Sequence, residues 1–210
     1  MTPRWLSNVA ILAMILGSCS CGSKKSAEMK AAPGQYKVLL QTTKGDVVVL
    51  VHRDWSPLGA DHFYELTKMG FYDDNAVFRA LRGFIVQWGM NGDPKVNKDW
   101  SEIPIRDDPP KVSNKIGTIV FAKTGEPNSR STQVFINLGD NSATLDSQGF
   151  TPFGEVIQGM EKVMSFYTEY GEGAPNGTGP SQAAIADIGN PYLEEHFPKL
   201  DYIKKTRIVP

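Results

Sequence analysis

The chain has little cysteine and little histidine, and this scarcity excludes several kinds of chemistry. Its only cysteines are Cys19 and Cys21, and it has 3 histidines, none paired at the spacing of metal ligands. Two cysteines so close together near one end cannot crosslink the fold or complete a zinc site. We therefore expect no metal and no cofactor, and a reaction, if there is one, that uses neither thiol nor metal.

The chain also lacks an excess of either charge. Its 22 lysines and arginines balance 23 acidic residues, which leaves a net charge of −1. Phosphate binding needs a concentrated basic face, so nucleic acid is not an expected partner. The glycine-rich stretch at residues 171–179 has neither common phosphate-loop spacing, and no G-x-S-x-G motif occurs.

The N-terminus has the pattern of an export signal. Residues 1–18 combine Arg4 with an apolar run at 9–16, which is too short to span a bilayer. The following letters, L-G-S-C, resemble a bacterial lipobox, which implies a lipid on Cys19. An ordinary cleaved signal with incidental cysteines is the alternative. We expect a lipoprotein signal peptide at 1–18, a flexible tether at 19–34 and one domain at 35–210 with a C-terminal extension.

Short apolar segments separated by turn residues predict a mainly β domain. Ser56 and Pro57 fit the cap and first position of a helix whose apolar stripe continues to Met69, with His62 as a structural residue beside it. Residues 89–113 are expected as loop. The other expected elements are strands at 36–42, 46–52, 117–122, 133–138, 152–156 and 182–188, a helix at 159–167, and a tail at 191–210 with a short helix and a last strand.

Two segments carry the functional signal. Residues 77–87 read V-F-R-A-L-R-G-F-I-V-Q, and residues 131–138 read S-T-Q-V-F-I-N-L. The polar Arg79 and Gln87 lie within segments that otherwise resemble buried strands. For an isolated arginine the ordinary interpretation is a surface position. The residue types, order and spacing together resemble the cyclophilin-type peptidyl-prolyl isomerases over about residues 36–188.

The resemblance implies a fold and a site. The fold would be a closed antiparallel eight-stranded β-barrel capped by two helices. Arg79 and Gln87 would be catalytic, and the substrate would lie against a group of mostly apolar residues. That group comprises Phe84, Ile85, Ala122, Gln133, Phe135, Leu145 and Phe150. For each apolar residue taken singly, core packing is the alternative interpretation.

Two positions at the rim of the pocket depart from the family pattern. The family's tryptophan before the pocket leucine is Thr144 here, and its rim histidine corresponds to Phe150. Two hypotheses follow. The first is an isomerase, expected as a monomer, that accelerates X-Pro isomerisation in unfolded or partly folded proteins outside the cytoplasm, on the outer membrane if the cell is Gram-negative. The second is a catalytically weak module that binds proline-containing segments of a partner.

Overall fold

The computed structural model describes residues 31–210. The expected signal peptide, Cys19 and most of the expected tether lie outside the described residues. At the start of the described chain Ala32 is already buried, and its N–H donates to Oδ1 of Asp61 at 2.9 Å. Within residues 31–210, no helix has both the length and the apolar character needed to cross a membrane.

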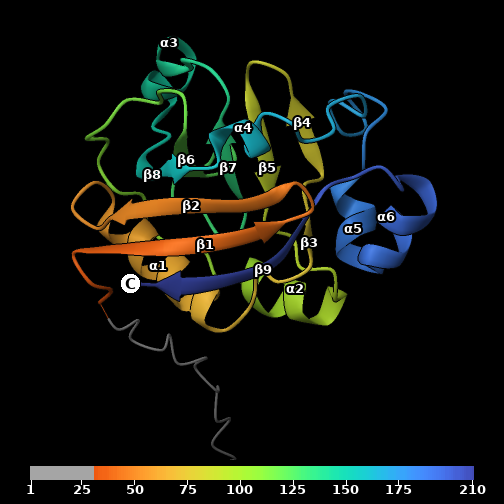
Figure 1. Cartoon of the computed structure of the whole chain (residues 1–210), viewed down its shortest axis with the longest axis horizontal. Helices are drawn as coiled ribbons and strands as arrows, with labels where there is room; N and C mark the ends of the chain where they lie inside the picture. The colour runs from red at the N-terminus through yellow and green to blue at the C-terminus, as the bar shows by residue number, and fades with distance from the viewer. Residues whose placement is uncertain (1–30) are drawn as a thin grey trace, which may run out of the picture.

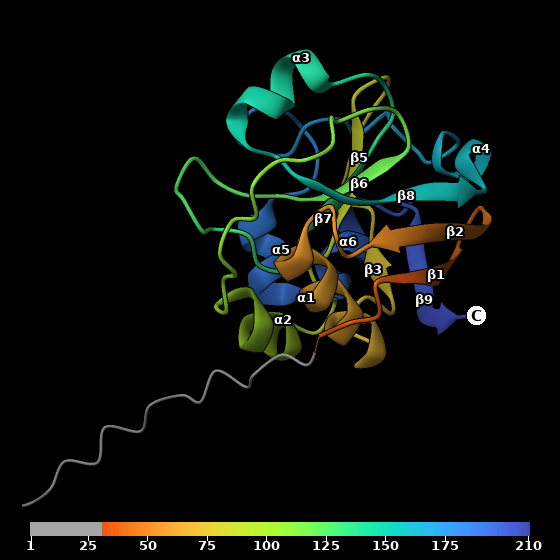
Figure 2. The same cartoon turned by 90° about the vertical axis from the view of Figure 1, so that its left-hand side faces the viewer.

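In the part of the chain that the structure describes, nine strands form a single sheet in the order β3-β9-β1-β2-β8-β6-β7-β5-β4. The sheet curls around a core that it shares with the helices (Figures 1 and 2). The strands are β1 Gln35–Thr42, β2 Gly45–His52, β3 Asn75–Ala76, β4 Arg79–Leu81, β5 Ile85–Trp88, β6 Thr118–Phe121, β7 Val134–Asn137, β8 Pro152–Gln158 and β9 Tyr202–Val209.

The expected closed eight-stranded barrel is wrong, because the sheet has nine strands and two free ends. Its end strands β3 and β4 lie close together in the sequence, but each pairs with a different neighbour. β3 pairs with β9, and β4 pairs with β5. The chain between them therefore joins the two ends covalently without a ladder of hydrogen bonds, which makes a curled half-barrel.

Within residues 31–210 the helices and the 3-10 turn are more numerous than the predicted helices, which are one from Pro57, one at 159–167 and a short one in the tail. Residues 182–188 form a helix instead of the expected strand, and the expected loop at 89–113 contains another helix. The expected helix at 159–167 is shorter. The elements are α1 Pro57–Lys68, α2 Pro94–Ser101, α3 Ser142–Leu145, η1 Asp146–Gln148, α4 Met160–Val163, α5 Gln182–Ile188 and α6 Asn190–His196.

The β1–β2 hairpin is confirmed. The two strands pair from Gln35 opposite His52 to Thr42 opposite Gly45. Alternate side chains such as Val38 and Val49 are fully buried, as the period of a half-buried strand requires. The C-terminal strand β9 then adds to the other edge of β1, so the tail belongs to the sheet.

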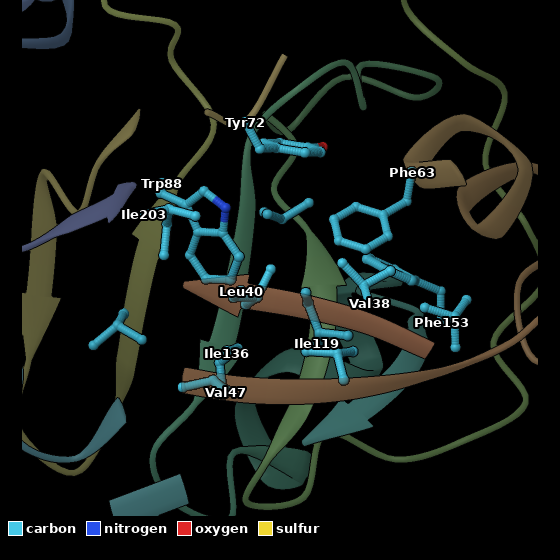
Figure 3. Close-up of a cluster of buried hydrophobic side chains, with 14 of the residues drawn as sticks. Val38, Leu40, Val47, Phe63, Tyr72, Trp88, Ile119, Ile136, Phe153 and Ile203 are labelled. Atoms are coloured by element: carbon cyan, nitrogen blue, oxygen red, sulfur yellow. The ribbon is translucent and has the colours of Figure 1, made fainter. Parts of the chain in front are cut away.

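The main core fills the space between the curled sheet and α1. Phe63 of α1 packs against Phe153 of β8, with ring centroids 5.0 Å apart, and against Tyr72 at 5.2 Å. Trp88 on β5 lies in the same cluster (Figure 3). A second, smaller cluster joins α5 and α6 to Phe78, so the C-terminal helices pack on the side of the sheet near β4 (Figure 1).

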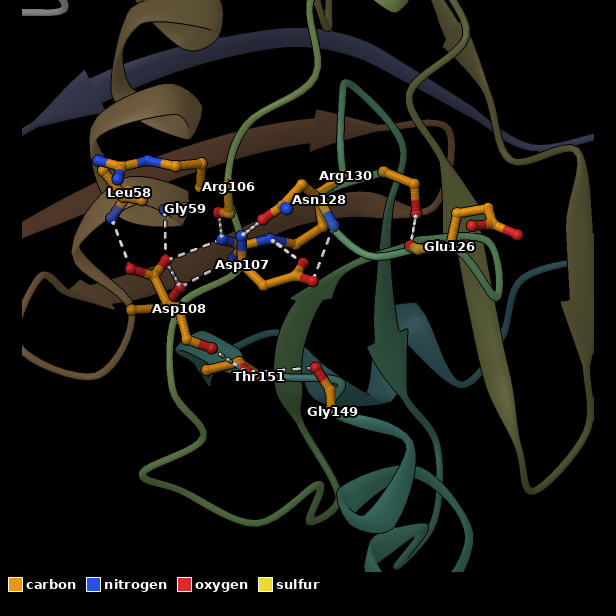
Figure 4. A network of polar contacts seen from close by, with 12 residues as sticks. Leu58, Gly59, Arg106, Asp107, Asp108, Glu126, Asn128, Arg130, Gly149 and Thr151 are labelled. Atoms are coloured by element: carbon orange, nitrogen blue, oxygen red, sulfur yellow. Dashed lines mark hydrogen bonds and ion pairs between the residues drawn. The ribbon is translucent and has the colours of Figure 1, made fainter.

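The cap of α1 differs from the expected one. Ser56 occupies the cap position, but its side chain makes no capping bond. Asp108, from a distant loop, accepts the N–H of Leu58 at 3.2 Å and of Gly59 at 3.0 Å. The buried Arg130 donates to the same carboxylate at 3.1 Å (Figure 4). A long-range ion pair therefore fixes the start of this helix.

Candidate active site

The candidate site begins as a row of side chains across neighbouring strands. Arg79 on β4 lies opposite Gln87 on β5, and Gln87 lies opposite Phe135 on β7. Residues directly opposite one another in antiparallel strands place their side chains on the same face of the sheet. The sheet register thus brings together two polar residues and an aromatic ring that are far apart in the sequence.

A chain of hydrogen bonds fixes the polar part of the row. Nη1 of Arg79 donates to Oε1 of Gln87 at 3.1 Å, and Nε2 of Gln87 donates to Oε1 of Gln133 at 2.7 Å. Gln133 in turn donates to Oε1 of Gln182, the first residue of α5, at 3.0 Å. Gln87 is buried with both ends of its amide satisfied, so it holds one orientation.

Arg79 has a second polar partner, Glu172, which the sequence did not indicate. Its Nε and Nη2 donate to the two carboxylate oxygens at 2.8 and 2.7 Å, which is the bidentate geometry of a strong ion pair. The guanidinium group, together with the N–H of Gly173, holds the pKa of Glu172 below its usual range, although partial burial opposes this shift. The carboxylate is therefore charged at neutral pH.

Beside the polar row lies a compact apolar cluster. Ile85, Phe135 and Leu145 are buried, and the partly buried Phe84 and Phe150 pack against them. The rings of Phe135 and Phe150 meet edge to face, with centroids 5.8 Å apart. This cluster separates from the main core because its side chains point to the opposite face of the sheet.

Local contacts hold the two chain segments that carry Leu145 and Phe150. Nδ2 of Asn141 donates to the carbonyl of Phe84 at 2.8 Å, which ties α3 to the turn before β5. Asn114 donates from its backbone and side chain to Asp146, at 2.9 and 2.8 Å. Burial would raise the pKa of Asp146, but hydrogen bonds from Asn114 and Ser113, together with the charge of Lys115, outweigh it and lower the pKa.

A cavity of about 370 Å³ opens between the polar row and the apolar cluster. All but one of the expected substrate-contacting and catalytic residues line it. These are Arg79, Phe84, Ile85, Gln87, Ala122, Phe135, Leu145 and Phe150. The exception is Gln133, which lines an adjoining cavity of about 260 Å³ together with Gln87 and Ala122.

Sequence reasoning missed several residues of the cavity wall. Lys123 and Gln148 line the cavity wall with Phe150. Glu172 pairs with Arg79, and Gln182 accepts a hydrogen bond from Gln133. Lys123 directly follows the expected Ala122, so adjacency to a predicted site residue was a usable signal. Glu172 and Gln182 come from the segment after β8, and only the folded chain brings that segment to the site.

The chemistry of this cavity is that of binding and hydrogen-bond donation. Its apolar wall suits a small ring, and the side chain of Arg79, 21% exposed, lies at its edge. Each terminal nitrogen of the guanidinium carries a second N–H that the contacts described above do not use. Within residues 31–210, no group of three or more His, Cys, Asp or Glu side chains is arranged to hold a metal ion.

Comparisons with known proteins agree on one family. The family model described as cyclophilin type peptidyl-prolyl cis-trans isomerase/CLD matches residues 37–182. Peptidyl-prolyl cis-trans isomerase B of Escherichia coli (strain K12) is 30% identical over 133 residues, covering 60% of this chain and 80% of the relative. Peptidyl-prolyl cis-trans isomerase A of Dickeya dadantii (strain 3937) is 31% identical over 147 residues, covering 66% and 76%.

A solved structure extends the likeness to the fold. The crystal structure of a cyclophilin type peptidyl-prolyl cis-trans isomerase from Cryptosporidium parvum aligns with a TM-score of 0.58 and 19% identity, covering 84% of this chain and 98% of that chain. The family model spans more than half of the chain. The chain belongs to the cyclophilin-type peptidyl-prolyl cis-trans isomerase family.

Proposed function

We propose that the protein catalyses cis-trans isomerisation of X-Pro bonds in flexible segments of unfolded or partly folded proteins outside the cytoplasm. The observation that carries this proposal is the placement of Arg79 at the edge of the small apolar pocket formed around Phe135 and Leu145. Such a pocket suits a proline ring, and a guanidinium at its edge would reach the nitrogen of a proline bound there.

The reaction requires no acid, base or nucleophile. Its barrier of about 18–20 kcal/mol arises from amide resonance, which is lost when the bond is twisted. In the twisted state the prolyl nitrogen becomes pyramidal and its lone pair accepts a hydrogen bond. The unused N–H groups of Arg79 would supply that bond, while Gln87 holds the guanidinium in place.

The free energy of a hydrogen bond indicates how much of the rate acceleration Arg79 and the pocket would each supply. A hydrogen bond to a charged group contributes about 1.5–3 kcal/mol, and about 1.4 kcal/mol corresponds to a tenfold change in rate. Arg79 would thus directly supply about one to two powers of ten. The rest would come from holding the proline ring still in the apolar pocket while the preceding carbonyl turns.

A second candidate function is binding without useful turnover. It is favoured by Thr144 and Phe150, which line the rim of the pocket where the family pattern has a tryptophan and a histidine. These substitutions change the surface that a peptide meets before its proline reaches the floor of the pocket. The module would then recognise a proline-containing segment of a partner.

One measurement separates the two functions. NMR exchange spectroscopy on an Ala-Pro peptide gives the rate of interconversion with and without the protein. The isomerase predicts faster exchange at catalytic amounts of protein. Peptide line broadening or shifts without faster exchange would support the binding module instead.

We further propose that the protein acts as a monomer on a membrane surface, held by lipid on Cys19. The support is the L-G-S-C sequence after an apolar run too short to span a bilayer. A lipid chain contributes about 0.8 kcal/mol per buried CH₂ group, and stable anchoring needs more than one chain. Cys19→Ser should release the protein from membranes or leave it unprocessed, and mass spectrometry showing an unmodified mature N-terminus would contradict the proposal.

A further inference from the structure

Glu172 reaches Arg79 because its loop adds to the free edge of β4. Gly171 forms an antiparallel bridge with Ala80, and this register places the next residue, Glu172, directly opposite Arg79. Arg79 therefore lies between two partners in one row, with Gln87 on β5 at one side and Glu172 at the other. The pairing follows from backbone geometry rather than from a chance meeting of long side chains.

Hydrogen bonds within the loop hold Glu172 in place. The carbonyl of Glu172 accepts the N–H of Gly179 at 2.8 Å, and its carboxylate accepts the N–H of Gly173 at 3.1 Å. A Cβ added at Gly177 would lie 2.3 Å from the carbonyl oxygen of Glu172, so only glycine fits there. These contacts fix both the backbone and the carboxylate of Glu172.

The contacts of Arg79 described above use three of the five N–H groups of its guanidinium. Nε and one N–H of Nη2 face Glu172, and one N–H of Nη1 faces Gln87. The second N–H groups of Nη1 and Nη2 are not used by these contacts and lie in the plane of the guanidinium. Because the group is planar, fixing two of its edges also fixes the direction of the third.

We infer that Glu172 is a positioning residue, which orients the guanidinium of Arg79 so that its remaining N–H groups face the substrate. This inference rests on the proposed isomerase function. A long arginine side chain otherwise samples many rotamers, and only those that aim a donor at the prolyl nitrogen assist the twisted state. Fixing the orientation before the substrate binds raises the rate without adding a contact to the ground state.

An opposite role is an inhibitory clamp, in which Glu172 withholds donors that the substrate needs. The two roles predict opposite results when the carboxylate is removed. If Glu172 is a clamp, removing its carboxylate should speed turnover. If Glu172 positions Arg79, removing the carboxylate should slow turnover.

The test compares Glu172→Ala and Glu172→Gln with Glu169→Gln in the full chain. Glu169 lies in the same segment, but its side chain is 67% exposed, and its ion pair is with the exposed Arg82 at 3.4 Å rather than with Arg79. Peptide exchange on an Ala-Pro substrate gives kcat and KM, and the ¹⁵N NMR signal of the Arg79 Nε–H reports the order of the guanidinium. A purely structural role would change neither the kcat nor this signal in a folded variant.

We expect Glu172→Ala to lower kcat about tenfold, with KM nearly unchanged and the Nε–H signal broadened or lost. Glu172→Gln should recover part of the loss, because its amide oxygen still accepts one bond, and Glu169→Gln should match the unmodified protein. Unchanged or faster turnover in Glu172→Ala, or an unchanged Nε–H signal, would overturn the inference. An unmodified protein without activity would instead reject the proposed function, and the NMR signal would still decide whether Glu172 orders Arg79.

Discussion

Arg79 and Gln87 lie directly opposite each other on β4 and β5, and Nη1 of the arginine donates to Oε1 of the glutamine at 3.1 Å. The amide nitrogen of Gln87 is engaged by Gln133 at 2.7 Å, so its oxygen must face Arg79. Gln87 therefore cannot rotate to offer its N–H to the arginine. The two residues act as one unit, and removing either alters the other.

Arg79→Ala should lower kcat/KM by about ten- to a hundredfold, which corresponds to about 1.5–3 kcal/mol from the lost charged hydrogen bond. The fold should survive, because Arg79 lies at the edge of a cavity rather than in a core cluster. Exchange spectroscopy on an Ala-Pro peptide, with circular dichroism as the check on folding, measures both effects.

Arg82→Ala is the matched control for this variant. Arg82 lies on the turn after β4, and its side chain is 84% exposed. It should retain the activity of the unmodified protein. If Arg79→Ala folds normally and turns over as fast as Arg82→Ala, the role given to Arg79 is wrong.

The activity should be nearly flat between about pH 6 and 9. Arginine stays protonated throughout this range, and Glu172 is already ionised because Arg79 lowers its pKa. Activity should fall only under acidic conditions, when Glu172 takes up a proton, and Glu172→Gln should lack this acid limb. A bell-shaped profile of kcat/KM centred near neutrality would point to a histidine as an acid or base instead.

Much of the site was predictable because strand patterns place residues at known intervals. Arg79 and Gln87 interrupt apolar segments, and a short turn at Gly83 makes those segments a hairpin. Once the hairpin is accepted, the two polar residues meet in register. The lining of the pocket by Phe135 and Leu145 then followed from the family resemblance and is seen in the cavity.

The errors have separate causes. Residues 182–188, Q-A-A-I-A-D-I, were expected as a strand, although their alanines favour a helix and Ser181 caps it at 3.4 Å from the N–H of Ala184. The Asp93-Pro94 pair that begins α2 was also a usable helix signal. Glu172 was different, because no local pattern reports which strand edge a glycine-rich loop will join.

His62 should make stability depend on pH. Burial, with a smaller contribution from Arg130, lowers its pKa to about 4, while a hydrogen bond with the backbone of Ser131 opposes the shift. The unfolded chain binds a proton below about pH 6.5 and the folded chain does not until about pH 4, so stability is full above this window and falls within it.

The free energy of unfolding should therefore be about 2 kcal/mol lower at pH 5 than at pH 7 from His62 alone. Urea unfolding of the unmodified protein and of His62→Phe at both pH values isolates this contribution, since the other titrating groups are shared. Equal pH dependence in the two proteins would show that His62 does not remain neutral in the fold.

The last prediction concerns Asp108, which caps α1 and pairs with Arg130 (Figure 4). Burial raises the pKa of Asp108, but hydrogen bonds from Ser56 and from the first turn of α1, together with the charge of Arg130, outweigh it and lower the pKa. Its stabilising effect is thus present above the ordinary carboxylate pKa and is lost as the pH falls through the lowered value.

Asp108→Ala should destabilise the protein by about 3–5 kcal/mol, because it leaves the charge of Arg130 buried without its main partner and the first N–H groups of α1 without an acceptor. Arg130 is 2% exposed and cannot recover water as a partner.

Asp107→Ala is the matched control, since that carboxylate is 31% exposed and 3.4 Å from Nε of Arg130, and its loss should cost about 1 kcal/mol or less. Urea unfolding at pH 7 measures both variants. A loss in Asp108→Ala no larger than that in Asp107→Ala would mean that the start of α1 is held by packing of Phe63 and its neighbours rather than by the ion pair.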